Sequence, residues 1–174
     1  MTEMKGAAGE PSRQSLAHLA GKYLTFQLSD EIYSIEILKV QEIIGIMSIT
    51  TVPKTPDYVR GVINLRGKVI PVVELRRKFG MATQEDTERT CIIVVQVAGS
   101  DGPITMGILV DEVSEVMDIK VEQIEPAPAF GTSVDTTFIL AMGKVGDRVV
   151  ILLDVDRVLT SGELDGLNRA AGQA

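Results

Sequence analysis

The sequence is poor in the residues that catalytic sites use most often. Its 174 residues include one histidine, His18, and one cysteine, Cys91. His18 lies in an N-terminal segment rich in Gly, Ala and Ser, so no structured imidazole is expected beside a serine or cysteine nucleophile. Cys91 lies in the apolar string CIIVVQV, which indicates a small buried hydrophobe rather than a reactive thiol. One cysteine also excludes an intrachain disulfide and a zinc site built from several cysteines.

Other catalytic patterns are missing or have a simpler explanation. No phosphate-binding loop of the form GxxxxGK followed by Ser or Thr occurs. Asp154 and Asp156 follow an apolar string, where acids in other folds hold magnesium or accept a phosphoryl group, but helix N-capping is favoured here. The acids between residues 111 and 125 match no calcium loop, so a solvated face is favoured. We therefore predict no catalytic residues, no cofactor and no metal site, and hence no enzyme.

Long apolar runs are absent as well. The longest run without a charged residue spans 11 positions, at residues 43–53 and again at 90–100, whereas a membrane-spanning helix needs about 18. The N-terminus lacks the basic start and apolar stretch of a secretory signal, which predicts a cytoplasmic protein. Residues 1–80 carry a net charge of +3 and residues 81–174 a net charge of −10. An acidic half disfavours nucleic acid as a partner and favours other proteins.

What the sequence has in abundance is β-branched residues. Valine and isoleucine number 37 against 14 leucines, which predicts a mainly β protein. Residues 22–28 and 32–37 alternate as a hairpin, and 91–97 forms a continuous apolar run typical of a strand buried on both faces. Thr55-Pro56-Asp57 predicts one helical turn over Asp57–Arg60, and Thr160-Ser-Gly-Glu163 predicts the start of a final helix.

An internal repeat gives the strongest indication of architecture. Residues 34–43 align without gaps on 107–116, and residues 68–77 align on 148–157, in the same order. We therefore expect an all-β fold of two small antiparallel barrels, which bury strand edges by closing on themselves. The expected organisation is a flexible tail over 1–21, a first barrel over about 22–80, a second over about 88–160 with strand exchange left open, and a C-terminal helix and tail over 161–174.

Surface residues remain as candidates for contact with partners. In an extended segment Val40 and Glu42 point the same way, and their counterparts in the repeat are Val113 and Glu115. Arg66 falls at the tip of a predicted turn. Composition alone assigns Arg66 to solubility and Val40 to a core, so these residues do not identify a binding site by themselves.

Four strings together resemble the CheW family of bacterial chemotaxis coupling proteins: residues 38–43 (LKVQEI), 61–76 (GVINLRGKVIPVVELR), 107–113 (GILVDEV) and 122–128 (EQIEPAP). The resemblance extends over residues 23–159. It implies two interleaved five-stranded barrels of the SH3-like kind. It also implies a non-enzymatic adaptor that joins the cytoplasmic helical hairpin of chemoreceptors to the regulatory domain of the histidine kinase CheA, with membrane association only through the receptors.

The resemblance also implies site residues. Glu125 and Phe130 would contact the kinase, although some relatives carry arginine where this chain has Glu125, so that contact either has a compensating partner or is weakened. The receptor-binding groove would contain Val40, Glu42, Gly61, Arg66, Val113 and Val116.

Alternative functions are a CheW-like scaffold in a non-motility pathway and a small ligand-binding barrel, and the barrel would need a polar pocket that the sequence does not locate. CheV and CheA contain the same fold, but they add a receiver or a kinase. A chain of 174 residues has no room for either, so a standalone module is expected.

Overall fold

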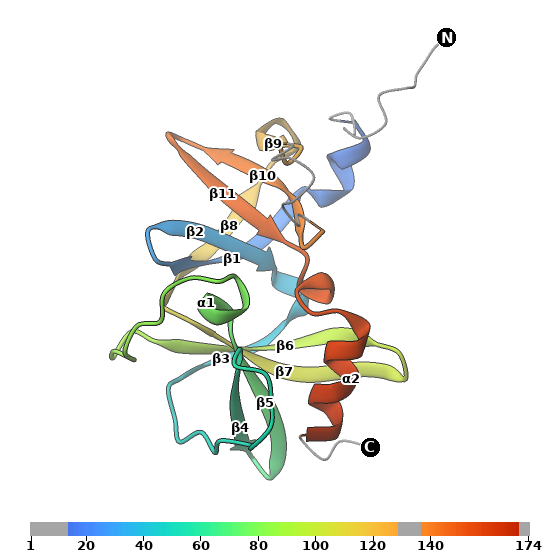
Figure 1. Cartoon of the computed structure of the whole chain (residues 1–174). Helices are drawn as coiled ribbons and strands as arrows, with labels where there is room; N and C mark the ends of the chain where they lie inside the picture. The colour runs from blue at the N-terminus through green and yellow to red at the C-terminus, as the bar shows by residue number, and fades with distance from the viewer. Residues whose placement is uncertain (1–13, 129–136, 171–174) are drawn as a thin grey trace.

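A computed structural model of the chain describes residues 14–128 and 137–170 (Figure 1). The described part is mainly β, as the sequence predicts, with short helices at the junctions and one longer helix at the C-terminal end. The helices are η1 (Gln14–Leu19), η2 (Ile37–Lys39), α1 (Leu75–Lys78), η3 (Val121–Gln123), η4 (Val155–Arg157) and α2 (Ser161–Ala170). The strands are β1 (Gly21–Leu28), β2 (Glu31–Glu36), β3 (Val40–Gly45), β4 (Val59–Leu65), β5 (Lys68–Glu74), β6 (Cys91–Gly99), β7 (Gly102–Val110), β8 (Glu112–Ile119), β9 (Ile124–Glu125), β10 (Ile139–Val145) and β11 (Arg148–Leu153).

The strands form two sheets that lie one above the other in Figure 1. The first sheet has the order β8-β1-β2-β11-β10-β9, and the second has the order β3-β6-β7-β5-β4. Neighbouring strands are antiparallel except for β2 with β11 and β5 with β7, which are parallel. Each sheet therefore has one parallel pair at its centre and hairpins on both sides of it, so the sheets are not purely antiparallel as expected from the sequence.

Each sheet is closed by the chain itself. After β8 the chain passes through η3 and returns as β9, which pairs with β10 at the far edge of the same sheet. After β3 the chain bends back so that Thr50 forms an antiparallel bridge with Val62 of β4. The first and last strands of each ladder are thus joined, which gives the two small barrels that the sequence predicts and leaves few free edges.

The two sheets repeat one another residue by residue. In the second sheet Val72 lies opposite Gly107, and in the first sheet Leu152 lies opposite Ser34. These are the pairs that the two sequence alignments match, because residue 72 corresponds to 152 and residue 34 to 107. The ladders also shift register at corresponding places, after Val40 in β3 and next to Val113 in β8. The internal repeat is therefore present in the strand pairing.

The repeated halves are interleaved. Strands β1 and β2 from the first half join β8 to β11, whereas β6 and β7 from the second half join β3 to β5. The expected boundaries of 22–80 and 88–160 consequently do not coincide with the two sheets. The exchange of two hairpins, β1–β2 for β6–β7, accounts for the difference.

Three clusters of buried side chains make up the core. The first barrel encloses residues that include Tyr23 and Leu152, and the second encloses residues that include Ile63 and Val94. The largest cluster takes side chains from both sheets and from α2. Alternate residues of β6 enter different clusters, so both faces of this strand are buried, as predicted.

Two local expectations differ from the structure. Part of the expected tail, residues 14–21, forms η1 and the start of β1, so His18 lies in a short helix rather than in a tail. Leu16 and Leu19 are buried in the core of the first barrel. Asp57–Arg60 forms a turn and the start of β4 rather than a helical turn. The Thr55 hydroxyl donates to the Val52 carbonyl at 2.8 Å and so does not cap a helix.

The predicted C-terminal helix is confirmed over Ser161–Ala170. Its capping box is formed, because the Glu163 amide donates to the Thr160 hydroxyl at 3.1 Å and the Thr160 amide donates to the Glu163 carboxylate at 2.8 Å. Lys78 of α1 donates to the same carboxylate at 2.8 Å, which fastens the helix to the second sheet.

Candidate interaction surface

Glu42 and Arg66 come together on the outside of the second sheet. Glu42 lies on β3, the outermost strand, and Arg66 lies at the tip of the β4–β5 hairpin. Two guanidinium nitrogens of Arg66 donate to the two carboxylate oxygens of Glu42, one of them at 3.3 Å. This hydrogen bonding raises the pKa of Arg66. The Arg66 side chain is 70% exposed and that of Glu42 is 30% exposed, so the paired charges face solvent.

The hairpin that carries Arg66 is a tight two-residue turn. Leu65 pairs with Lys68, and the φ angles of Arg66 and Gly67 are 54° and 87°. Two successive positive φ angles are typical of the type I′ turn, whose twist matches that of the flanking strands. The Asn64 side chain accepts a hydrogen bond from the Gly67 amide at 2.8 Å and fixes the turn. Arg66 therefore projects from a rigid support.

Gly61 lies on β4, the strand that leads into the Arg66 hairpin, at a point of close backbone packing. It is buried in β4 with a φ of 148°. A Cβ atom at this position would lie 2.2 Å from the Thr50 carbonyl oxygen and 2.9 Å from the Ile49 side chain. The backbone bridge that closes the second barrel therefore requires glycine here.

We expect Gly61→Ala to lower the free energy of unfolding by about 1–3 kcal/mol, because the new methyl group would push the Thr50 segment away. Gly45→Ala is the matched control, since a Cβ atom there has no neighbour within 4 Å. Urea unfolding followed by circular dichroism gives both values. Equal stabilities of the two variants would contradict the packing argument.

The three valines lie on the outer strands of both sheets. Val40 of β3 and Val113 of β8 occupy equivalent positions, and both are half-buried against the cluster between the sheets. Val116 of β8 is 50% exposed. Its equivalent on β3 is Ile43, which is 43% exposed. Ile43 corresponds to Val116 in the repeat alignment, which is the sequence signal for this further exposed apolar residue.

The structure describes one of the two residues expected at the kinase contact. Glu125 lies on β9, and its carboxylate is 3.8 Å from the Lys144 ammonium group of β10. The negative charge of Glu125 thus has a counter-charge within this chain. Phe130 lies outside the described residues.

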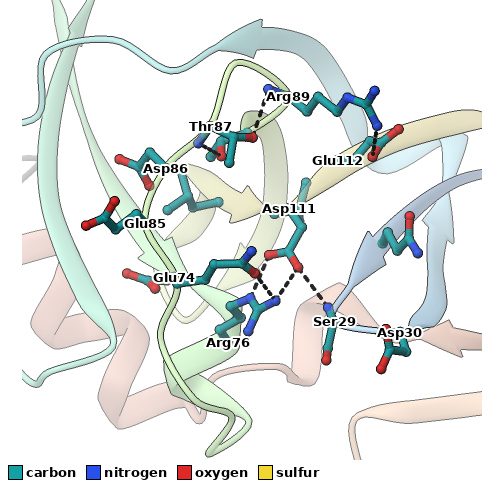
Figure 2. A pocket seen from close by; sticks show the side chains of 15 residues that line it. Ser29, Asp30, Glu74, Arg76, Glu85, Asp86, Thr87, Arg89, Asp111 and Glu112 are labelled. Carbon is teal, nitrogen blue, oxygen red and sulfur yellow. Dashed lines mark hydrogen bonds and ion pairs between the residues drawn. The ribbon is translucent and has the colours of Figure 1, made fainter.

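A polar pocket of about 380 Å³ opens beside α1 and the β7–β8 turn (Figure 2). Arg76 donates to both carboxylate oxygens of Asp111, at 2.7 and 2.6 Å, and to the Ala82 carbonyl at 2.8 Å. Arg60 pairs with Glu74 at 3.3 Å on another wall. The charged side chains here bind one another and fasten the segment after α1, which is typical of a structural network.

The acids that follow β11 are structural as well. The Asp154 side chain accepts from the Asp156 amide at 3.1 Å, so the predicted capping role is confirmed for Asp154. Asp156 instead binds Lys39 at 2.8 Å.

Within residues 14–128 and 137–170, no group of three or more His, Cys, Asp or Glu could hold a metal ion. No helix in these ranges is long and apolar enough to cross a membrane.

Comparison with known proteins assigns the family. The family model of the CheW-like domain matches residues 22–163. The chain belongs to the CheW family. It is 39% identical to the chemotaxis protein CheW of Klebsiella aerogenes over 155 residues, which cover 86% of this chain and 91% of that protein. It is 34% identical to the CheW of Helicobacter pylori over 157 residues, or 90% of this chain and 92% of that one.

A solved structure supports the same assignment. The crystal structure of the scaffolding protein TtCheW from Thermoanaerobacter tengcongensis matches with a TM-score of 0.73 and 34% identity, covering 83% of this chain and 97% of that one. The CheW family consists of chemotaxis scaffold and adaptor proteins rather than enzymes.

Proposed function

We propose that this CheW-family protein is a cytoplasmic adaptor that couples the helical tips of chemoreceptors to the histidine kinase CheA and helps to build the receptor–kinase array. The observation that carries the proposal is the Glu42–Arg66 pair, exposed on the outer edge of one sheet near the half-buried Val40. In this proposal the groove formed by Val40, Glu42, Gly61, Arg66, Val113 and Val116 receives the receptor.

The chemistry of this surface suits an amphipathic helix. Valines at equivalent positions of β3 and β8 would receive the apolar stripe of the helix. A glutamate and an arginine at the rim would fix its register through charge. Glu125 and Phe130 would form a separate contact with the regulatory domain of CheA. The pair of Glu125 with Lys144 would then offer that domain a locally neutral surface.

The proposal is tested by calorimetric titration of the purified protein with a receptor-tip fragment and, separately, with the CheA regulatory domain. We expect saturable binding to each, because Glu125 on β9 lies on a different strand from the residues of the proposed receptor surface. Adding the protein to CheA and receptor-containing membranes should then change kinase autophosphorylation. The proposal fails if neither fragment binds and kinase output stays the same.

A further inference from the structure

Two ion-pair clamps occupy related places in the repeated halves, one before each outer strand. In the first, which we call the Asp156 clamp, the Asp156 carboxylate accepts from the Lys39 ammonium group at 2.8 Å and from the Ala98 amide at 2.9 Å. The hydrogen bond to Asp156 raises the pKa of Lys39. The clamp thus joins η4, η2 and the end of β6.

The second, the Asp111 clamp, appears in Figure 2. The Asp111 carboxylate accepts from Arg76 at 2.7 and 2.6 Å and from the Ser29 amide at 2.8 Å. It joins α1, the β7–β8 turn and the end of β1. Each clamp therefore combines one cation, one carboxylate and one backbone amide from three separate segments.

The repeat places two of the three groups of each clamp in corresponding positions. The amides of Ser29 and Ala98 are equivalent, because Phe26 lies opposite Val113 and Val95 lies opposite Val40 in the two ladders. The side chain after the central strand differs in charge between the clamps, and its partners Lys39 and Asp111 come from neighbouring rather than aligned positions, because residue 39 corresponds to 112. Arg76 corresponds in the alignment to Asp156, so the segment after β5 supplies the cation while the segment after β11 supplies the acid.

Both clamps lie where an outer strand begins. Lys39 directly precedes Val40, and Asp111 comes two residues before Val113. The short helix η2 lies against β1 of one sheet and β6 of the other, so the start of β3 falls at the junction of the two sheets. Ile37 packs on the central core and Lys39 is held by Asp156, while Leu38 between them is 92% exposed. The clamp, together with Ile37, thus fixes both ends of the turn that leads into β3.

We propose that Asp156 and Arg76 are positioning residues for the receptor-facing surface, acting through Lys39 and Asp111 on the strands that carry Val40 and Val113. The inference rests on the proposed function, because it concerns the same surface. In this proposal, separate clamps hold the two strands that line the groove, β3 and β8. Loss of one clamp then shifts one wall without unfolding the protein.

A double-mutant cycle on the Asp156 clamp tests this. Asp156→Asn keeps an oxygen for the Ala98 amide and removes the charge, and Lys39→Met keeps the apolar stem. We expect each single variant to raise the Kd for the receptor-tip fragment about three- to tenfold, and the double variant to bind no more weakly than either single one. The Kd for the CheA regulatory domain should stay the same.

Lys78→Met is the matched control. Lys78 pairs with Glu163 at 2.8 Å with side-chain exposures of 21% and 26%, close to the 34% and 28% of Lys39 and Asp156. This variant breaks a comparable ion pair that fastens α2, and we expect receptor binding to be unchanged. An effect of Lys78→Met equal to that of Asp156→Asn would indicate general loosening and overturn the inference.

Further results would decide whether the Asp156 clamp positions β3. Unchanged receptor affinity in Asp156→Asn, or independent additive losses in the cycle, would also overturn the inference. If the wild-type protein does not bind the receptor fragment, the receptor contact of the proposed function fails instead, and hydrogen exchange of the β3 amides in the free protein still tests the clamp. Faster exchange over residues 40–45 in Asp156→Asn than in Lys78→Met would support positioning, and equal exchange would refute it.

Discussion

Replacing Arg66 with Asp is expected to weaken binding of a receptor-tip fragment roughly tenfold or more while leaving the fold intact. The variant removes the positive charge and places a carboxylate beside Glu42, so the surface becomes locally acidic. The fold should tolerate the change because the φ of 54° at this position suits Asp better than most residues. Calorimetry gives the affinity, and thermal unfolding by circular dichroism checks the fold.

Two companion variants separate charge from support of the hairpin. Arg148→Asp reverses an exposed arginine next to the equivalent turn of the other sheet, and receptor affinity should not change. The double variant Glu42→Arg with Arg66→Asp restores the ion pair with reversed polarity. If it binds the receptor like the wild type, the pair only supports the hairpin. If binding remains weak, the partner requires a negative charge at position 42 and a positive charge at position 66. Wild-type affinity in Arg66→Asp itself would remove Arg66 from the surface.

Phe26→Ala is expected to lower the free energy of unfolding by about 3–5 kcal/mol, the largest stability effect that we predict. Phe26 is fully buried in the cluster shared by both sheets. Its ring lies 6.2 Å from that of Tyr33, and the stack continues to Phe79 at 5.9 Å. Removing the ring leaves a cavity that rigid strands from both sheets cannot fill.

The measurement is urea unfolding, followed both by circular dichroism and by resolved NMR signals from each sheet. Because the large cluster unites the sheets, both signals should report one transition at the same urea concentration. Val149→Ala is the control, since Val149 is 52% exposed and its truncation should change stability by less than about 0.5 kcal/mol. A loss below about 1 kcal/mol in Phe26→Ala would contradict the central role of this cluster.

Local features of the fold were predictable wherever nearby residues determine them. The alternation over residues 22–28 and 32–37 predicted the β1–β2 hairpin, and the apolar string at 91–97 predicted a strand buried on both faces. The capping box at Thr160 and Glu163 needs only residues of the helix end itself. Helical signals at Asp57–Arg60 failed because Val59 pairs with Val73 across the sheet, and tertiary pairing overrides local propensity.

The candidate site could be predicted only in part. The family resemblance identified Glu42 and Arg66 as site residues, whereas composition alone assigned Arg66 to solubility. No local pattern indicates that the two residues pair, because they are 24 positions apart. Their pairing depends on how the β4–β5 hairpin lies against β3. Asp156 was expected to cap a helix. It binds Lys39 instead, 117 positions away, which no local pattern indicates.

The sequence by itself determined the class of the fold, its internal repeat, its scarcity of histidine and cysteine and the resemblance to the CheW family. These depend on composition, short periodicity and residue strings, which are local properties. Only the tertiary structure decided which hairpins, β1–β2 and β6–β7, exchange between the halves, and that Lys39 pairs with Asp156 and Arg76 with Asp111. The physical reason is that an exchanged and an unexchanged hairpin share the same alternation of buried residues, so the choice between them lies in non-local strand pairing and in ion pairs between distant segments.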